Sequence, residues 1–407
     1  MMSSAAAAPR PPTGRQAWAG VWAMSLAAFA LVASEFMPVS LLTPIAADLH
    51  ITEGRAGQAI SISGAFALLA SLFISSAAGR LDRKALLVSM TLLMIISGTI
   101  VAFAPNYEVF MVGRGLIGVA IGGFWSMSTA TVMRLVADRY IPRALAILNG
   151  GNALATVVAA PLGSFLGALI GWRWAFFAVV PVAAIAMGWK LLSLPSMKVD
   201  RTSSTVGMFQ LFMRTPVALG MLAVSLFFMG QFALFTYLRP FLEAVTHVSV
   251  STLSLLLLGL GVSGFVGTIA IGSFLKDGLY RTLVTIPLMM AVIAIALVAW
   301  GDSLVLTATL LCAWGLIATA APVGWGTWLV RTVPKDAEVG GGIMVAVIQL
   351  AIMLGAMGGG ILFDMNGYRA TFDMSATVLF VAAVIAALAG RAALLFVDRG
   401  SPPGAAP

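Results

Sequence analysis

Long apolar runs separated by short polar breaks recur along the whole 407-residue chain, and they limit its fold more than any other feature. A helix of ~20 apolar residues crosses the hydrocarbon layer of a bilayer. Membrane-spanning strands would need alternating segments of ~10 residues, and we find none. The sequence therefore predicts twelve membrane-spanning helices, at 17–43, 56–79, 85–104, 107–133, 144–170, 174–194, 215–242, 249–275, 282–300, 303–330, 339–363 and 371–395.

The composition agrees with a surface that faces lipid. Hydrophobic residues make up 60% of the chain and charged residues 9%, whereas soluble proteins carry about 25% charged residues. The net charge of +8 does not indicate a nucleic-acid partner, because the basic residues are scattered among the polar breaks. The single cysteine, Cys312, lies in an apolar run, so we expect neither a disulfide nor a cysteine metal site.

The polar segments divide the chain into two halves. Residues 1–16 are rich in Ala and Pro, and we expect them to be disordered. The next run is longer than the core of a signal peptide, so we interpret it as a retained first span. The longest internal break predicts a cytoplasmic linker at 196–213, between six-helix bundles at 17–195 and 214–396, with a tail at 397–407.

Lysine and arginine positions predict the orientation, because cytoplasmic loops carry an excess of both. With both termini in the cytoplasm, the outer loops hold Arg55, Arg173, Arg239 and Arg369 out of 23 basic residues, and Arg114 lies inside a span. The remaining basic residues, Lys190 among them, then fall on the inner side. We therefore expect a multi-pass protein of the bacterial inner membrane with both termini inside.

The two halves also resemble each other in sequence. The segment Gly171–Phe176 recurs as Gly367–Phe372, and the pair Glu35-Phe36 is matched at nearly the same offset by Gln231-Phe232. Two six-helix repeats of parallel topology, with a binding site near the membrane midplane between them, are an architecture of secondary transporters.

One acidic residue of the 15, Glu35, lies well inside a span. An ionisable group within the membrane is costly and is therefore a candidate functional residue. Arg114 lies at a similar depth, ~10 Å against ~13 Å from the outer ends of the two spans at about 1.5 Å per residue. We expect the two to form an ion pair or to compete for the proton of Glu35. The alternatives are a carboxylate that only fixes helix packing and an arginine bonded to nearby helix carbonyls.

Polar and aromatic residues on the same helices are candidates for binding a solute. Planar rings stack on a planar solute, and amides bond its hydroxyl and ring-nitrogen groups. The tryptophans fit equally well with membrane-interface belts or core packing. The candidates are Trp125, Ser126, Asn149, Asn152, Gln231, Tyr237, Trp325, Trp328 and Gln349.

Short motifs resemble those of the major facilitator superfamily, in particular its drug:proton antiporters. Asp82-Arg83-Lys84 resembles the family's loop motif, and Gly272–Arg281 resembles its second copy. Ala160–Gly167 resembles the antiporter signature, and Arg114 resembles the arginine linked to proton coupling. The resemblance implies an all-α integral membrane fold of two pseudo-symmetric six-helix bundles. It also implies gating roles for Asp82, Arg83, Lys84, Asp277, Arg281, Pro161 and Gly163.

Longer stretches resemble the bacterial purine-ribonucleoside efflux pumps of this superfamily: Glu35–Pro44, Gly122–Trp125, Ala160–Gly167, Gln231–Tyr237, Pro322–Trp325 and Val345–Leu350. This resemblance implies export of inosine- or guanosine-like nucleosides in exchange for protons, by a monomer. Sugar and drug exporters share several of these motifs, so export of a sugar or a drug is the alternative.

Other classes of function have less support in the sequence. Gly259-x-Gly261-x-x-Gly264 has the spacing of a dinucleotide-binding loop but lies in an apolar run with no strand before it, which favours helix packing. We find no Walker-type phosphate loop, so we expect no nucleotide cofactor and no enzymatic activity. A membrane enzyme or a solute sensor is a remote alternative, because we see neither catalytic groups gathered at one face nor an output domain.

Overall fold

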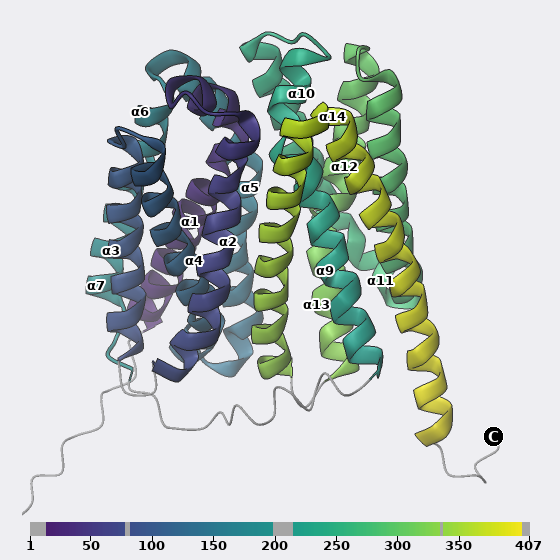
Figure 1. Cartoon of the computed structure of the whole chain (residues 1–407). Coiled ribbons are helices and arrows are strands. Elements are labelled where there is room, and N and C mark those ends of the chain that lie inside the picture. Colours follow the sequence, from purple (N-terminus) through teal and green to yellow (C-terminus); the bar gives the residue numbers. More distant parts are fainter. Residues whose placement is uncertain (1–13, 78–81, 198–214, 334–336, 401–407) are drawn as a thin grey trace, which may run out of the picture.

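The computed structural model describes residues 14–77, 82–197, 215–333 and 337–400, and nearly all of them are helical (Figure 1). The first half contains α1 (Gly14–Asp48), α2 (Glu53–Ala77), α3 (Arg83–Ala102), α4 (Tyr107–Leu135), η2 (Asp138–Tyr140), α5 (Ile141–Ile170), α6 (Trp172–Phe177) and α7 (Val179–Ser193). The second half contains α9 (Thr215–Thr236), α10 (Leu238–Ala244), α11 (Val250–Trp300), α12 (Leu304–Ala318), α13 (Ala321–Thr332) and α14 (Ala337–Gly400).

α11 and α14 each consist of two helical segments that are joined at a bend. The backbone of α11 leaves helical geometry at Gly278, and that of α14 does so at Gly367 with φ 74°. A positive φ is tolerated by glycine because it has no Cβ. Figure 1 shows α14 reversing at one end of the bundle, so that its second segment runs back towards the opposite end.

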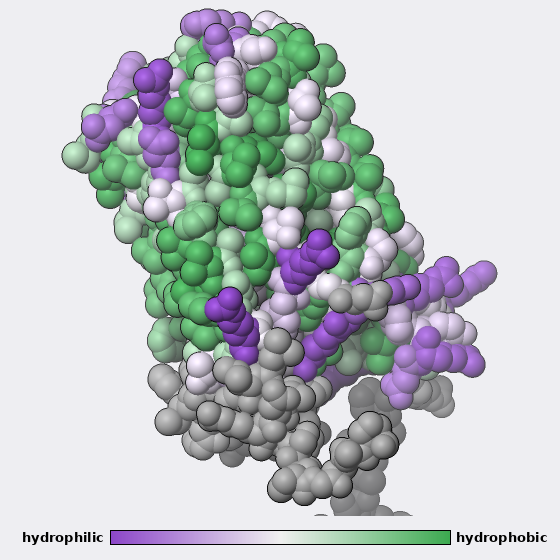
Figure 2. Space-filling view, turned by 90° about the vertical axis from the view of Figure 1, so that its right-hand side faces the viewer, coloured by the Kyte–Doolittle hydropathy of each residue, from purple (hydrophilic) through white to green (hydrophobic). Residues whose placement is uncertain are grey.

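The described residues contain eleven helices that are long and apolar enough to span a membrane, the last of them the 54-residue segment Gly340–Ala393. At about 1.5 Å per residue this segment is more than twice as long as the hydrocarbon layer is thick. Because it reverses at Gly367, it crosses twice, and the prediction of twelve crossings in an all-α fold is confirmed. Figure 2 shows the matching surface, with hydrophobic residues over the middle and hydrophilic residues gathered towards the ends.

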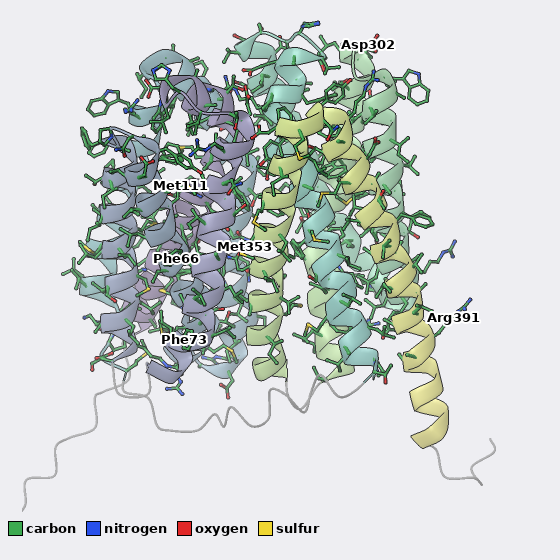
Figure 3. All side chains as sticks on the ribbon, in the orientation of Figure 1. Phe66, Phe73, Met111, Asp302, Met353 and Arg391 are labelled. Carbon is green, nitrogen blue, oxygen red and sulfur yellow. The ribbon has the colours of Figure 1, made fainter. Side chains whose placement is uncertain are left out.

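The short helices α6 and α10 and the bend of α14 lie at one end of the bundle, which we call the α10 end (Figure 1). Asp302 lies at the same end and Arg391 towards the opposite one (Figure 3). One hydrophobic core lies within the first half and contains Leu31, Ile121 and Phe124. The core of the second half contains Phe227, Trp314 and Phe372, and it extends to Val39, Ile60 and Ala160 of the first half.

The halves meet along α2 and α14, in what we call the α2–α14 seam. A Cβ added at Gly54 would lie 2.4 Å from the carbonyl oxygen of Gly360, and one at Gly64 would lie 3.2 Å from the Cβ of Met353. Figure 3 shows Met353 between the two helices. The glycines of α2 therefore let the two backbones approach closely. A second contact of this kind places Gly261 of α11 against α5.

Some expected boundaries differ from the observed helices. α1 begins at Gly14, inside the segment expected to be disordered, and α14 continues to Gly400, past the expected end of the second bundle at residue 396. Residues 1–13, most of the linker (198–214) and residues 401–407 lie outside the described part of the chain.

Candidate functional site

Glu35 lies in the middle of α1 with 7% of its surface exposed. It is the only buried carboxyl group among the residues that the structure describes. Its carboxyl group interacts with the side chain of Gln349, which lies on α14 in the opposite half. A buried carboxyl group within the membrane-spanning part of the chain therefore lies where the two halves meet.

A proline removes one backbone hydrogen bond of α1 next to Glu35. Pro38 lies inside α1, and because it has no N–H it leaves the carbonyl of Ser34, four residues earlier, without its helical partner. Arg114 of α4 supplies that partner, with 2.8 Å from Nη1 to the Ser34 oxygen. An unpaired carbonyl in the membrane would cost several kcal/mol, so this bond allows the proline at this depth.

The rest of the Arg114 guanidinium is also bound. It donates to the carbonyl oxygens of Glu35 at 3.2 Å and Ala59 at 3.1 Å, and to the hydroxyl of Ser63 at 3.3 Å. The ion pairs within 4.0 Å that the structure describes are Arg173–Asp48 and Arg239–Glu243, not a pair between Arg114 and the Glu35 carboxylate. The two charges still interact electrostatically. In this conformation the expected ion pair gives way to the alternative, an arginine bonded to helix carbonyls.

An aromatic cluster lies beside the acid. The ring of Phe36 stacks on Phe232 of α9 with 5.8 Å between centroids and meets Phe235 edge-on at 6.3 Å. Trp125 of α4 packs in the same region of α1 and α5 as Phe36. Trp125 is thus the predicted tryptophan that packs against the same part of α1 as Phe36. The sequence did not indicate these phenylalanines as solute contacts.

Two amide oxygens near this cluster have no hydrogen-bond partner. They are Oε1 of Gln231, next to Phe232, and Oε1 of Gln349. A buried polar atom without a partner costs about 1–3 kcal/mol, so such atoms are rare unless a ligand or water completes them. Acceptors of this kind fit a solute that carries hydroxyl or N–H donors.

Other predicted solute contacts lie elsewhere or are already occupied. Trp325 and Trp328 are 2% and 0% exposed, and they meet edge-to-face at 5.9 Å in the core of the second half. The hydroxyl of Ser126 donates to Gly122 at 2.6 Å, and the amide of Asn149 donates to Leu145 at 2.9 Å, each within its own helix. Both side chains are exposed, and Asn152 on the same helix as Asn149 is half-buried.

Tyr237 lies in the α2–α14 seam rather than beside Glu35. It is fully buried, its hydroxyl donates to the carbonyl of Ala356 at 2.8 Å and lies 3.4 Å from that of Gly54, and its ring stacks on Phe363 at 5.2 Å. In this conformation its ring and its hydroxyl therefore join the two halves.

Asp82 of the loop motif is the N-cap of α3. It accepts hydrogen bonds from the backbone N–H of Lys84 at 2.8 Å and of Met197 at 2.9 Å, and from the hydroxyl of Ser196. Burial of the carboxyl group opposes ionisation, but these hydrogen bonds outweigh it and hold the pKa of Asp82 below its usual value. Lys84 donates to the carbonyl of Leu191 at 2.8 Å.

The bonds described for this motif lie within the first half. Those of Asp82, Lys84 and the Arg83 backbone join the start of α3 to the end of α7 and to the residues that follow it. Of the second copy of the motif, Arg281 is exposed. The side chain of Asp277 lies outside the described part of the structure.

The antiporter-type segment of α5 lies at two helix contacts. Pro161 leaves the carbonyl of Val157 without its helical partner, and a Cβ added at Gly261 of α11 would lie 2.7 Å from that oxygen. A Cβ at Gly163 would lie 2.6 Å from the hydroxyl oxygen of Ser40 in α1. These residues thus allow close packing of α5 against α11 in the opposite half and against α1 in its own half.

Lys190 was expected on the inner side, near the end of the span predicted at 174–194, and it is fully buried in α7. Its ammonium donates to the hydroxyl of Thr91 at 2.6 Å and to the carbonyl of Leu87 at 3.3 Å, and it lies 5.0 Å from the ring centre of Phe124. A lysine at the end of a predicted span is expected to reach water, so nothing in the sequence indicates that this one is buried.

A family model described as Major Facilitator Superfamily matches residues 24–341. The solved structure of a bacterial homologue of the human lysosomal transporter Spinster superposes with TM-score 0.76 and 16% identity, covering 96% of this chain and all of that one. The chain therefore belongs to the major facilitator superfamily and is a multi-pass membrane transporter.

Named relatives align over nearly the full length. The chain is 58% identical to the transcription regulatory protein OpdE of Pseudomonas aeruginosa, over 93% of this chain and 96% of that protein. It is 39% identical to the purine ribonucleoside efflux pump NepI of Escherichia coli strain K12, over 91% and 94%.

Proposed function

We propose that the protein exports purine ribonucleosides across the bacterial inner membrane in exchange for protons. The observation that carries the proposal is Glu35, a buried carboxyl group between the halves, with the partnerless amide oxygens of Gln231 and Gln349 and a phenylalanine cluster beside it. The similarity to NepI supports the substrate class.

The chemistry of a purine nucleoside matches this group of residues. Its planar base stacks on aromatic rings, and its ribose hydroxyls and base N–H groups donate to amide oxygens. Trp125, Phe36 and Phe232 supply the rings, and Gln231 and Gln349 supply the acceptors. Because Gln349 also contacts Glu35, a solute that takes over its amide changes the surroundings of the carboxyl group.

Proton exchange through Glu35 provides the driving force. The lysine and arginine distribution assigns the α10 end to the periplasm, so protons reach Glu35 when that end opens. One proton that moves inward through a potential of about 100 mV releases ~2.3 kcal/mol. At about 1.4 kcal/mol per decade this supports roughly fortyfold accumulation of a neutral solute outside.

Everted membrane vesicles test the proposal directly. Labelled inosine should accumulate in vesicles that contain the protein when the inside of the vesicles is made acidic relative to the outside. An uncoupler should abolish the accumulation. Excess unlabelled guanosine should compete, whereas a sugar should not. Accumulation of a sugar or a cationic drug, without accumulation of inosine, would instead favour the alternative substrate classes.

The 58% identity to a protein named as a transcription regulator favours a second candidate, an effect on gene expression. A transporter produces such an effect indirectly, by changing the cellular level of a small molecule. Cells that express the Glu35→Gln protein distinguish the two routes, because an indirect effect disappears when gradient-driven export is lost. Transcript changes that persist with this variant would support a direct regulatory role.

A further inference from the structure

α1 contains a second proline, Pro44, in addition to Pro38. Pro44 leaves the carbonyl of Ser40 without its helical partner, just as Pro38 does for Ser34. The partner of Ser40 is again a guanidinium, because Arg239 donates from Nη1 to its carbonyl oxygen. Both proline-freed carbonyls of α1 are therefore bound by arginines from other helices.

The two arginines differ in where they come from. Arg114 lies on α4 in the same half as α1, so its bonds can persist when the halves move. Arg239 lies on α10 in the opposite half, so its bond to Ser40 must break if the halves separate at the α10 end. In the present conformation Arg239 is 7% exposed and closely confined.

When the bond between Arg239 and Ser40 breaks, Arg239 still has Glu243 as a hydrogen-bond partner. Its Nε donates to Glu243, one turn further along α10, at 2.8 Å, and Glu243 moves with the same half. The charge thus stays neutralised when the bond to Ser40 is lost. The carbonyl of Ser40, in contrast, has no N–H in α1 to return to, so only water that enters the open end can replace the arginine.

A second polar contact closes the same end. Asp364 of α14 accepts from the hydroxyl of Thr52 at 2.6 Å and from the backbone N–H of Gly54 at 2.9 Å, at the N-terminus of α2. Bonds of this kind are exchanged for water on opening at small net cost, unlike apolar contacts. The α10 end is thus held by contacts that can be made and broken.

We propose that Arg239 is a positioning residue for the transport cycle. It binds the proline-freed carbonyl of Ser40 when the α10 end is closed and releases it when that end opens. Because Ser40 lies five residues after Glu35 in the same helix, the closed end fixes the segment that carries the acid, and opening frees it. The proposal does not depend on which solute is carried.

Distances between spin labels at the α10 end test the proposal without any solute. Labels are placed on the exposed positions Ala47 and Asp302 in a Cys312→Ser background, and pulsed electron spin resonance gives the ratio of separated to close conformations. Arg239→Gln should raise this ratio about tenfold, as expected for the loss of one charge-assisted hydrogen bond. Arg239→Lys should raise it less.

The matched control is Arg369→Gln. Arg369 is an exposed arginine whose Nε contacts Tyr368 on its own helix at 3.3 Å, so its loss should leave the ratio unchanged. Equal ratios in the Arg239→Gln and Arg369→Gln proteins would overturn the proposal. Because no transport is measured, this result is distinct from a failure to export nucleosides.

Pro44→Ala provides an independent test if the Arg239→Gln protein does not fold. Alanine restores an N–H that bonds Ser40 within the helix, which weakens the dependence on Arg239. Pro44→Ala alone should therefore raise the ratio, and Arg239→Gln should add little in that background. An unchanged ratio in Pro44→Ala, or fully additive effects in the double variant, contradicts the proposed role.

Discussion

At the scale of single residues, Glu35 is the group to which we assign the proposed proton coupling. Replacing Glu35 by Gln removes the titratable proton but keeps the size and hydrogen bonding of the side chain. We expect the variant to lose gradient-driven export while it still binds the solute and exchanges it passively. Vesicle uptake and equilibrium binding measure the two properties separately.

Glu108→Gln is the control, because Glu108 is an exposed acid in the first turn of α4. This variant should export at the wild-type rate. Uphill export by the Glu35→Gln protein at the wild-type rate would mean that the proton uses another group, and the coupling mechanism would then be wrong.

Arg114 leads to a second prediction, which concerns stability. Its planar fork reaches four acceptors on two neighbouring helices, and the ammonium of a lysine cannot reproduce that geometry. Arg114→Lys should lower the free energy of unfolding by about 1–3 kcal/mol. Pro38→Ala restores the internal bond to Ser34 and should recover part of this loss. If Arg114→Lys unfolds in the same way as Arg369→Lys, the carbonyl bonds contribute nothing measurable.

The sequence identifies some site residues and hides others for physical reasons. Glu35 and Arg114 stand out because charge inside an apolar run is costly, and hence visible. The burial of Trp328 and Tyr237 depends on which face of each helix packs against its neighbours. A helix that is apolar on all sides does not reveal that face in its sequence. Pro38 and Pro44 in α1 were a usable signal, since each frees a carbonyl that some donor must bind.

At the scale of helices, the N-cap of α3 gives a pH-dependent prediction. The pKa of Asp82 is lowered in the folded protein. Its contribution to stability is therefore complete above the unfolded pKa of about 3.9 and is lost as the pH falls through the lower folded value. Asp82→Ala should lower the stability by about 1 kcal/mol at neutral pH. Thermal unfolding of the two proteins should converge as the pH falls below about 4, and a gap that widens on acidification would contradict this role.

The glycines of α2 allow the α2–α14 seam to close. A Cβ at Gly57 would lie 2.2 Å from the hydroxyl oxygen of Tyr237, so Gly57→Ala must displace the ring or separate the helices. We expect this variant to favour an open α10 end, as measured by the separation of labels at Ala47 and Asp302. Gly326→Ala on α13 is the control, because a Cβ there meets no atom within 4 Å. An equal label separation in the two variants would show that the seam tolerates a side chain.

The helices themselves were predictable because bilayer thickness fixes their length and hydropathy reveals them. The bend at Gly367 is an example. The sequence has a polar break there between two predicted spans, and in the structure the chain reverses at that glycine. The contact between α2 and α14 was not predictable, because the residues that meet, such as Gly64 and Met353, are small or apolar and lie far apart in the sequence.

At the scale of the whole molecule, the candidate site and the contacts that close the α10 end both lie between the two halves. Glu35 and Gln349 face each other from opposite halves, and the bonds of Arg239 and Asp364 join those halves at the α10 end. Any movement that parts the halves at that end therefore alters the surroundings of the acid. We therefore propose that proton uptake at Glu35 is coupled to opening of the α10 end through these contacts, without a separate signalling route.

A reversible cross-link between the halves tests whether the α10 end opens during transport. A Cβ at Gly54 would lie 2.4 Å from the Cγ of Asp364, so cysteines at these two positions come close enough to form a disulfide. In a Cys312→Ser background, oxidation of the Gly54→Cys/Asp364→Cys protein should stop export, because the end can no longer open. Reduction should restore it, and each single-cysteine protein should be insensitive to the oxidant. If the cross-linked protein exports at the rate of its reduced form, the halves do not separate at this end, and the solute must leave by another route.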